Sequence, residues 1–272
     1  MKNPSEILIV TPTLGTRQTL HETCKSVRDI GGDKVHHVLT CPQTSIEAVS
    51  GMVEGTEVIE EGRGKGVFGA VNHILKSRAS NYDWVGYIND DDYWLPDMKG
   101  LIDSAMENRE NDILYGRVLF VNQRGKPLMV SSCTARYKSF PILAARGVSI
   151  FTQQAALIRS DLFLQLGGFD ESFRLVADND FWIRAITGGA RCRFIDRVCA
   201  AYRLQPGQLT ADSKTQKAET SRVLAQYGLR GDTWLARLEA ARFRLENSKL
   251  YLTRLLKTRG RGFVVRRHVG RE

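Results

Sequence analysis

Three consecutive aspartates, Asp90, Asp91 and Asp92, follow a short apolar run at residues 84–88. The run has the length and the aromatic content of a buried strand, and a helix is expected to begin near Pro96. Adjacent carboxylates repel one another unless water or a cation neutralises them, and apolar neighbours limit the access of water. A hard divalent cation, Mg²⁺ or Mn²⁺, would neutralise them. The alternative is that these acids cap the following helix and lie in a solvated turn.

A second pair of acids, Asp178 and Asp180, lies where a helix carrying Phe181 and Trp182 is expected to begin. The helix dipole favours carboxylates in the first turn. Simple capping therefore explains this pair as well as catalysis does, and both interpretations stay open on the spacing alone.

Strands and helices are expected to alternate through the first part of the chain. The strands are predicted at residues 7–14, 35–40, 56–60 and 84–88, and the helices at residues 16–30, 43–53, 67–79 and 96–107. Further strands are predicted at residues 112–122, 149–158 and 191–203. This alternation is typical of an α/β fold with a mostly parallel sheet flanked by helices. Ligands bind such sheets at the carboxyl ends of the strands, which is where the three aspartates lie.

Gly64, Gly66 and Gly69 form the spacing GxGxxG between a strand and a helix, which formally matches the dinucleotide-binding fingerprint of dehydrogenases. That fingerprint belongs to the first strand-to-helix turn. These glycines follow the third predicted strand and precede an acidic cluster with no role in redox chemistry. The dehydrogenase interpretation is therefore the weaker one.

The composition is that of an ordinary globular protein, with 42% apolar and 25% charged residues in a chain of 272. No apolar run reaches the roughly 18 residues of a membrane span, and the apolar segment at residues 7–10 is too short for a signal peptide. A cytoplasmic location is expected. The five cysteines are scattered without CxxC spacing, which argues against a disulfide framework and against a zinc site.

The net charge is concentrated near the C-terminus. Residues 222–272 hold 13 Lys or Arg and 4 Asp or Glu, a difference equal to the whole formal charge of +9. The Pro-Gly loop at residues 205–212 marks a boundary between a main α/β domain, residues 1–212, and a basic amphipathic helical extension, residues 213–272. A helical stripe in the extension recurs at steps of three and four residues: Trp234, Leu238, Ala241, Leu245, Ser248, Leu252 and Leu255.

This stripe suits three roles, namely packing on the main domain, pairing with a second copy in a homodimer, or contact with an anionic membrane surface. The segregated positive charge favours the membrane. Nucleic acid is a rival partner, because basic tails also bind phosphates. The extension has few aromatics and no recognised nucleic-acid motif, so no nucleic-acid partner is expected.

Four segments together resemble the family 2 glycosyltransferases of the GT-A fold, particularly bacterial polysaccharide and glycolipid sugar transferases. They are IVTPTLGTRQTL (residues 9–20), GKGVFGAVNHIL (64–75), YINDDDYWLPD (87–97) and FTQQAALIRSDLFLQLGGFDESFRLVADNDFWIR (151–184). They are similar, in order, to the family's nucleotide-binding strand, its KGxxxAxNxG segment, its DxD strand and the block that ends in the catalytic carboxylate. The resemblance implies a Rossmann-like, mixed and mostly parallel sheet over about residues 7–205.

The resemblance also implies roles for individual residues. The DxD slots fall on Asn89 and Asp91, which makes Asp91 the leading metal ligand, and the catalytic base falls on Asp178. Thr11, Pro12 and Thr13 would line the base pocket, and Asn72 with Arg63 or Lys65 would approach the nucleotide. The implied donor-binding residues are Thr11, Pro12, Thr13, Arg63, Asn72, Asn89 and Asp90, and the implied metal ligands are Asp91 and Asp92.

The chain departs from the family pattern at three places. Asn89 replaces a carboxylate in the first DxD slot, although an amide can still accept a ribose hydroxyl or hold a metal-bound water. The stretch at residues 41–45 replaces an acidic segment whose aspartate contacts the base, so Gln43 or Thr44 would substitute for it. Gln153-Gln154 stands where relatives often have His-Gln, so details of the acceptor side are expected to differ.

The resemblance implies an inverting, metal-dependent glycosyltransferase. Its donor would be a nucleoside diphosphate sugar, with UDP- or dTDP-sugars favoured, and its acceptor a cell-surface glycan or a lipid-linked sugar at the cytoplasmic face of the membrane. A divalent cation would offset the charge of the leaving diphosphate, and Asp178 would take the acceptor's proton. The alternatives are a non-catalytic sugar-nucleotide or glycan-binding relative of the same fold, and a nucleotidyltransferase.

Overall fold

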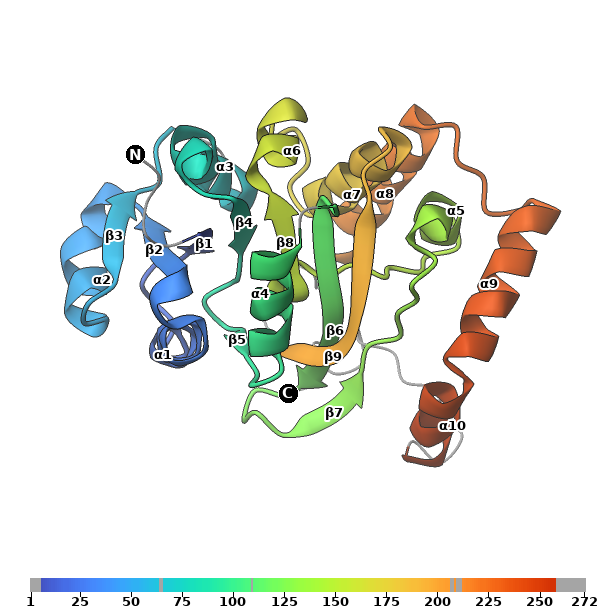
Figure 1. Ribbon diagram of the computed structural model, residues 1–272, viewed down its shortest axis with the longest axis horizontal. Helices are drawn as coiled ribbons and strands as arrows, with labels where there is room; N and C mark the ends of the chain where they lie inside the picture. Colours follow the sequence, from blue (N-terminus) through green and yellow to red (C-terminus); the bar gives the residue numbers. More distant parts are fainter. Residues whose placement is uncertain (1–5, 64–65, 109, 206–207, 209–211, 258–272) are drawn as a thin grey trace.

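The computed structural model describes residues 6–63, 66–108, 110–205, 208 and 212–257. In these residues nine strands form one curled sheet with helices on both faces (Figure 1). The sheet has the order β3-β2-β1-β4-β8-β6-β9-β5, with β7 paired to β6 at the side. The strands are β1 (Ile7–Pro12), β2 (Val35–Cys41), β3 (Glu57–Glu60), β4 (Trp84–Tyr87), β5 (Tyr93–Trp94), β6 (Ile113–Val121), β7 (Pro127–Val130), β8 (Ala156–Arg159) and β9 (Cys192–Arg203).

The strand directions divide the sheet into a parallel part and a mixed part. β1 pairs parallel with both β2 and β4, and β2 pairs parallel with β3. β8 runs antiparallel between β4 and β6, and β9 is parallel to β6 and antiparallel to β5. The expectation of a mixed, mostly parallel α/β sheet is confirmed for the first half of the chain, and the antiparallel pairs come from strands after residue 92.

The helices cover both faces of the sheet and extend beyond it at the C-terminal side. They are α1 (Leu20–Gly31), α2 (Ile46–Met52), α3 (Gly66–Arg78), α4 (Met98–Glu107), α5 (Phe140–Ala144), α6 (Ser160–Gln165), α7 (Ala177–Thr187), α8 (Ser213–Gln226), α9 (Trp234–Glu246) and α10 (Ser248–Lys257). Among the described residues, no helix has both the length and the apolarity that a membrane span requires.

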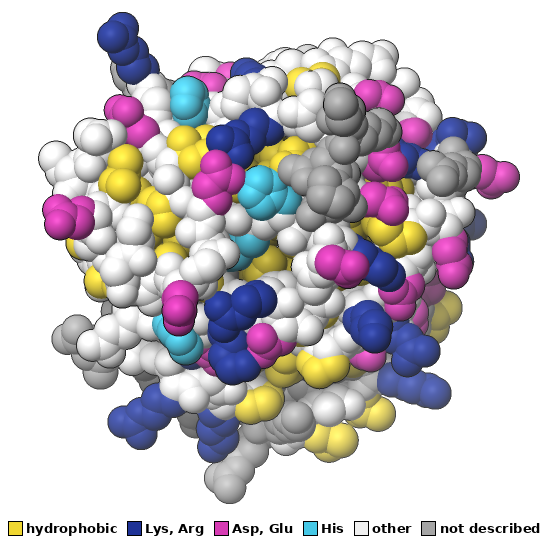
Figure 2. Space-filling view, turned by 60° about the vertical axis from the view of Figure 1, so that its left-hand side comes forward, with side chains coloured by type: hydrophobic (Ala, Val, Ile, Leu, Met, Phe, Trp, Pro, Cys, Tyr) yellow, Lys and Arg dark blue, Asp and Glu magenta, His cyan; other side chains and the backbone are white. Residues whose placement is uncertain are grey.

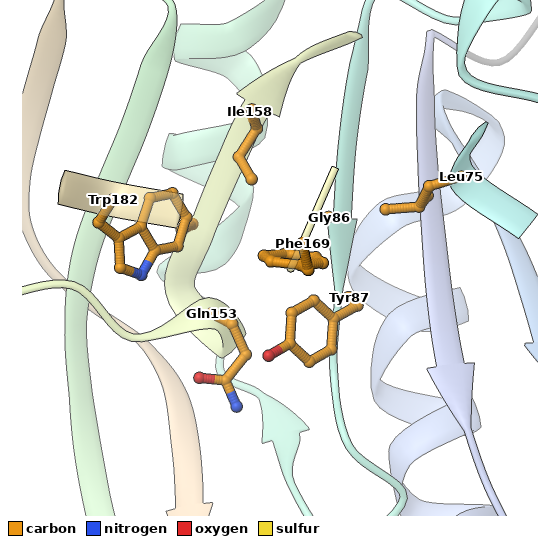
Figure 3. A pocket seen from close by; sticks show the side chains of 8 residues that line it. Leu75, Gly86, Tyr87, Gln153, Ile158, Phe169 and Trp182 are labelled. Atoms are coloured by element: carbon orange, nitrogen blue, oxygen red, sulfur yellow. The ribbon is translucent and has the colours of Figure 1, made fainter. Parts of the chain in front are cut away.

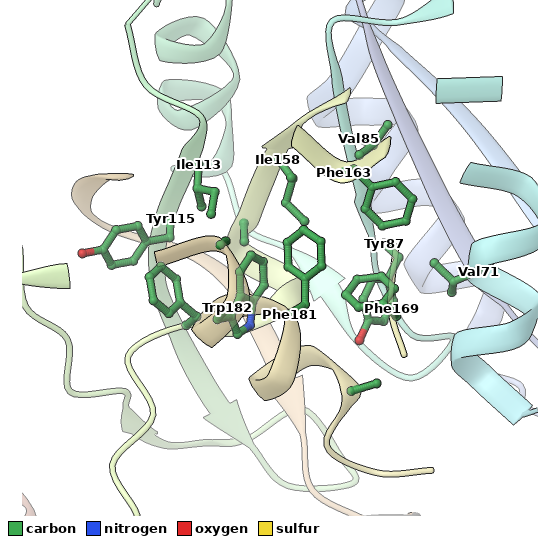
Figure 4. Packing of buried hydrophobic residues seen from close by; sticks show 14 of the residues in the cluster. Val71, Val85, Tyr87, Ile113, Tyr115, Ile158, Phe163, Phe169, Phe181 and Trp182 are labelled. Atoms are coloured by element: carbon green, nitrogen blue, oxygen red, sulfur yellow. The ribbon is translucent and has the colours of Figure 1, made fainter. Parts of the chain in front are cut away.

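Two hydrophobic cores lie on opposite faces of the sheet. Along β1, Ile7 and Ile9 belong to one core and Leu8 and Val10 to the other, because successive side chains of a strand point to opposite faces. α1 and α4 cover the first core, and α3, α6 and α7 cover the second. The second core is rich in aromatics, and Figure 4 shows several of them meeting around Phe169 between α3 and α7. All five cysteines are buried and unpaired.

Several elements differ from the sequence-based expectation. Of the strand predicted at residues 149–158, only β8 is a strand, because residues 153–155 form a short 3₁₀ turn that turns the chain toward the acidic residues. The helix predicted from residue 16 begins at Leu20, after a turn in which Gly15 has φ 73° and an added Cβ would lie 2.7 Å from Val49. The short elements β5, β7, α5 and α6 carry little periodicity and were not predicted.

The C-terminal helices pack on the rest of the chain through residues that lie outside the predicted apolar stripe. α8 is tied down by Glu219, which accepts hydrogen bonds from the backbone N–H groups of Arg174 and Leu175, each 2.8 Å long. α9 packs against α5 and buries Ala236, Ala240 and Phe243. The predicted apolar stripe is helical as expected, but Asn247 divides it between α9 and α10. The side chains of the stripe are exposed.

Candidate functional site

The acidic loop, residues 89–92, leaves the carboxyl end of β4 beside the end of β1. Ile88 donates a backbone hydrogen bond of 3.0 Å to Val10, which continues the parallel pairing of the two strands. The first residues of α1 hold the loop from the other side, because the hydroxyls of Thr19 and Thr23 donate to the carbonyls of Asp90 and Asp92 at 2.9 and 2.6 Å. The carboxyl edge of the sheet therefore carries the acids, as the strand pattern predicts.

Asp90 is held by residues that follow β1. Its carboxylate accepts a 2.7 Å hydrogen bond from the Thr13 hydroxyl and a 3.1 Å hydrogen bond from Arg17 Nη1. Burial raises the pKa of Asp90, although Thr13 and Arg17 oppose that rise. Thr13, one of the predicted donor-binding residues, is thus brought into direct contact with the acidic loop.

Asp91 is the member of the loop that carries the most varied contacts. Its Oδ2 accepts hydrogen bonds from the side-chain amides of Gln205 (2.7 Å) and Gln208 (3.1 Å), and it forms an ion pair with Arg17. Only 3% of the residue is exposed. The negative charge of this buried carboxylate is therefore stabilised by the guanidinium of Arg17, which follows β1, and by two amides from residues that follow β9.

Both carboxylate oxygens of Asp92 accept hydrogen bonds from other residues of the protein. Its Oδ1 accepts from the backbone N–H of Arg203 at 2.8 Å, and its Oδ2 accepts from the side-chain amides of Gln154 at 2.6 Å and Asn89 at 3.4 Å. Burial and the neighbouring charge of Asp91 raise the pKa of Asp92 well above its ordinary value. Both oxygens hold the loop in place, and the role of Asp92 as a metal ligand stays a prediction.

Arg203, at the end of β9, fastens the acidic loop to the last strand of the sheet. Its Nε donates to the carbonyl of Asp91 and its Nη1 to the carbonyl of Gln123, each at 2.9 Å, and its Nη2 pairs with Glu22 on α1. The guanidinium also lies 5.3 Å from the ring centroid of Tyr93. Sequence reasoning missed this residue, and the only signal was an arginine at a strand end just before a Pro-Gly loop.

The same reasoning missed Arg17, Gln205 and Gln208. Gln208 is informative about a cation, because its Oε1 is buried and has no hydrogen-bond partner among the described residues, while its Nε2 faces Asp91. Among the described residues, no three His, Cys, Asp or Glu side chains gather as a complete metal cage. Mg²⁺ and Mn²⁺ favour oxygen donors, and Mg²⁺ commonly binds through one or two carboxylates together with substrate phosphates. The Asp91 carboxylate and the Gln208 oxygen fit such a cation.

Asp178 lies in the first turn of α7, half-buried, with its Oδ1 accepting a 2.8 Å hydrogen bond from the backbone N–H of Asn179. Burial raises the pKa of Asp178 to about 6, which the hydrogen bonds to backbone N–H groups only partly oppose. Asp180 differs, because it pairs with Arg184 at 2.7 Å and accepts from the Tyr227 hydroxyl at 2.8 Å. Asp180 therefore anchors its helix, whereas the Asp178 carboxylate has no side-chain hydrogen-bond partner among the described residues.

Tyr87, at the end of β4, links the two groups of acids. Burial raises the pKa of its hydroxyl, and the charges of both Asp178 and Asp92 raise it further. The phenol therefore lies within electrostatic reach of both carboxylates. Figure 3 shows the Tyr87 hydroxyl and the Trp182 indole nitrogen directed toward Gln153, and that buried nitrogen has no hydrogen-bond partner among the described residues.

Two predicted donor-binding residues lie elsewhere. Arg63 and Asn72 line an open hollow of ≈ 500 Å³ beside α3, together with Gly69, His73, Lys76, Ser77 and Glu171. The Asn72 amide bonds to the backbone of Phe169, at 2.8 and 2.9 Å, and to Glu171 at 2.8 Å. Asn72 therefore holds the loop before α7, and its contact with a nucleotide stays a prediction.

The remaining predicted residues fall into two groups. Thr11 and Pro12 are buried in β1, and the Thr11 hydroxyl bonds to His37 Nε2 at 2.9 Å. Their position beside the acidic loop is compatible with a base pocket, which stays a prediction. Gly64 of the GxGxxG spacing and Lys65 lie outside the described residues.

The model of the family "Glycosyl transferase family 2" matches residues 8–167. None of the curated proteins matches the chain significantly.

Solved structures share the fold at low sequence identity. A mannosyltransferase from Pyrobaculum calidifontis, PcManGT in complex with GDP-Man and Mn²⁺, is 16% identical with a TM-score of 0.59, over 97% of this chain and 79% of that one. S. aureus TarS 1-349 with UDP-GlcNAc is 15% identical with a TM-score of 0.58, over 86% and 73%. A further TarS 1-349 structure is 18% identical with a TM-score of 0.53, over 75% of this chain, which spans 60% of that one. The family match covers more than half of the sequence, and the chain belongs to glycosyl transferase family 2.

Proposed function

We propose that the protein is an inverting glycosyltransferase that moves a sugar from a nucleoside diphosphate donor to a hydroxyl of a glycan or glycolipid. The observation that carries this proposal is the pairing of two different carboxylate environments around Tyr87. On one side lies the acidic loop, in which the Asp91 carboxylate pairs with Arg17 and the Asp91 carbonyl accepts from Arg203. On the other side lies Asp178, which is ionised near neutral pH and has a pKa raised to about 6. A general base works best when its pKa is close to the working pH.

The donor side of the proposal rests on the edge of the sheet at β1 and β4. Thr11, Pro12 and Thr13 would surround the base, and Asn89 and Asp90 the ribose, with Arg63 and Asn72 as further donor-binding candidates. The solved relatives contain UDP-GlcNAc in one case and GDP-Man with Mn²⁺ in another. A uridine or deoxythymidine diphosphate sugar is the donor class that we favour for this chain.

A divalent cation, Mg²⁺ or Mn²⁺, held by Asp91, with Asp92 as the other candidate ligand, would supply charge neutralisation for the leaving diphosphate. Asp178 accepts the proton of the acceptor hydroxyl as that oxygen bonds to the anomeric carbon. The bond between this carbon and the phosphate oxygen breaks, and the nucleoside diphosphate leaves with the electron pair. Because the acceptor attacks from the side opposite the leaving group, the configuration at the anomeric carbon inverts.

The acceptor that we propose is a cell-surface glycan or a lipid-linked sugar. The transfer would then take place in the cytoplasm, at the inner face of the cell membrane. Gln153, with the Tyr87 hydroxyl and the Trp182 nitrogen directed toward it, is the polar group that we assign to the acceptor side.

The donor class is tested by thermal unfolding with UDP, dTDP, GDP, ADP, CMP and NAD, each with and without Mn²⁺. A ligand that binds only the folded state raises the melting temperature. We expect stabilisation by UDP or dTDP that requires Mn²⁺. Stabilisation by NAD alone would instead support the dehydrogenase interpretation. Donor binding without transfer to any glycan acceptor would support the alternative of a non-catalytic sugar-nucleotide-binding relative.

A further inference from the structure

Large apolar side chains are exposed on one part of the surface far more than elsewhere. The described residues include ten such side chains, and eight of them lie between residues 234 and 256. They are Trp234, Leu235, Leu238, Leu245, Tyr251, Leu252, Leu255 and Leu256. We call this surface of α9 and α10 the C-terminal apolar face. Its two helices lie at one edge of the molecule in Figure 1, beyond the sheet.

This face is not needed for packing α9 onto the protein. α9 buries the opposite side, which carries Ala236, Ala240 and Phe243. Trp234 and Leu245 remain 74% and 76% exposed. A helix that buries one face and leaves a second apolar face in water has a surface suited to a partner.

The charges of α9 are sorted between the two sides. Its acidic residues, Glu239 and Glu246, turn toward the body of the protein and pair with Arg136. Arg237 and Arg244 are exposed and, by helical spacing, border the apolar stripe on one side. Arg242 borders it on the other side and forms an ion pair of 2.9 Å with Glu239. The outer surface therefore combines an apolar centre with basic edges.

The side of the molecule seen in Figure 2 lacks this separation. Over the side of the molecule that carries β2 and β3, Lys and Arg lie interspersed with Asp and Glu (Figure 2). Several of these charges form exposed ion pairs, such as Arg78 with Glu57 and Lys25 with Asp29. This side of the molecule therefore lacks the sorted charge of the C-terminal helices.

We infer that the C-terminal apolar face docks on an anionic phospholipid surface. Leucines bordered by arginines, with a tryptophan at the start of the helix, match the composition of helices that lie in the plane of a membrane interface. Anionic headgroups attract the basic edges, and the leucines enter the boundary of the acyl chains. A symmetric dimer through the same face would bring the arginine borders of two copies together, which like charge opposes. Nucleic acid would engage the arginines and leave the leucines in water.

This inference deepens the proposed function, and it rests on that function for its biological reason, since a lipid-linked acceptor lies at such a surface. The two are tested separately, because vesicle binding needs neither donor nor acceptor. The full chain would be sedimented with vesicles of phosphatidylcholine, with and without phosphatidylglycerol. We expect binding that requires phosphatidylglycerol and weakens as salt rises, because salt screens the charges.

Two double variants separate the contributions. Leu245→Gln with Leu252→Gln should reduce partition into phosphatidylglycerol vesicles by about tenfold or more. Arg237→Gln with Arg244→Gln should reduce it by a similar factor and flatten its dependence on salt. The matched controls are Met52→Gln, an exposed apolar residue on α2, and Lys25→Gln with Arg28→Gln, exposed bases on α1. The controls should bind like the unchanged protein, and melting temperatures should stay equal because all these side chains are exposed.

Unchanged binding by the leucine variant would overturn the inference, because some other part of the chain would then hold the membrane. Equal binding to pure phosphatidylcholine would overturn the role of the arginines. Sedimentation velocity gives a third outcome. If the unchanged protein is a dimer that the leucine variant converts to a monomer, the face is a subunit interface and the inference is wrong.

Discussion

Arg17 forms an ion pair with Asp91 at the carboxyl edge of the sheet, and the same Nη1 atom hydrogen-bonds to Asp90 at 3.1 Å. The guanidinium is 34% exposed at its side chain, whereas the Asp91 side chain is 4% exposed. A partly exposed cation of the protein therefore neutralises the carboxylate to which we assign the divalent metal. The two cations compete for one negative charge.

Removal of this guanidinium should strengthen metal binding. In Arg17→Met, Asp91 loses its ion pair, and we expect Mn²⁺ to bind about fivefold more tightly, equivalent to roughly 1 kcal/mol for a partly exposed pair. Isothermal titration calorimetry with MnCl₂ measures this in the absence of any donor. Arg28→Met, which removes an exposed arginine from α1, should bind Mn²⁺ like the unchanged protein. Weaker Mn²⁺ binding by Arg17→Met would show that Arg17 supports the cation site.

Asp178→Asn should abolish transfer while leaving donor binding intact. An asparagine of similar shape cannot take the acceptor's proton, and general base catalysis contributes on the order of 10² to 10⁴ in rate. Transfer is measured by release of the nucleoside diphosphate in the presence of an acceptor, and donor affinity by calorimetry. Asp180→Asn is the matched control on the same helix, and it should lose stability because Arg184 and Tyr227 lose a partner. An unchanged rate in Asp178→Asn would exclude this residue as the base.

The transfer rate should depend on pH because the carboxyl group of Asp178 must be ionised. Asp178 accepts a proton only when it is ionised, and its pKa is raised to about 6. We therefore expect kcat/KM to be level above pH 7 and to fall about tenfold per pH unit well below pH 6. A profile of initial rates between about pH 3 and about pH 8 checks this. A fall centred near pH 4 would mean that the carboxyl is exposed to water in the active protein.

Asp178→Asn should also stabilise the fold near neutral pH. In the folded state Asp178 keeps its proton up to about pH 6, whereas in the unfolded chain it loses the proton near its ordinary pKa of 3.8. Between these values the folded state binds more protons, so the free energy of unfolding decreases as pH rises. Asparagine removes this loss, and because the side chain is only half-buried we expect a gain of about 1 to 2 kcal/mol at pH 7. Urea unfolding at pH 7 and near pH 4 measures it, and the gain should disappear at the lower pH.

Arg203→Met should weaken both the fold and the acidic loop. The substitution leaves the buried carbonyl of Asp91 and the partly buried carbonyl of Gln123 without their donor, which should cost roughly 3 kcal/mol in urea unfolding. Arg193→Met, on the exposed side of β9, is the control and should change stability by less than about 0.5 kcal/mol. A similarly small change in Arg203→Met would show that Arg203 is not what holds the loop.

The acidic loop could be predicted from the sequence because its signal is local. An apolar strand that ends in acids places them at the carboxyl edge of a parallel sheet, whatever the remaining fold is. The partners of these acids could not be predicted. The backbone N–H of Arg203 and the Asp92 carboxylate are separated by 111 residues, and Gln208 and Asp91 by 117. No periodicity of the chain connects such pairs, so only the pairing of β9 with β5 and β6 reveals them.

The C-terminal stripe shows a second limit of the sequence. Its spacing from Trp234 to Leu245 correctly indicates a helix with one apolar face, but the spacing of a helix cannot say what covers that face. The burial of Ala236 and Phe243 on the other side depends on small and aromatic residues at positions that the stripe does not include. Asn247 ends the first helix of the stripe through hydrogen bonds to Cys133, which lies 114 residues earlier.

Several partners of the acidic loop come late in the chain. During synthesis the loop therefore gains its full set of contacts only after β9 and the residues that follow it have been made. The three aspartates leave the ribosome together with β1 to β4, before β9 and the glutamines that follow it have been made. Until then Asp91 lacks Gln205 and Gln208, Asp92 lacks the N–H of Arg203, and the nascent carboxylates stay hydrated. A fragment that ends before residue 203 therefore leaves the acidic loop without the partners that fix its conformation, however well its parallel strands form.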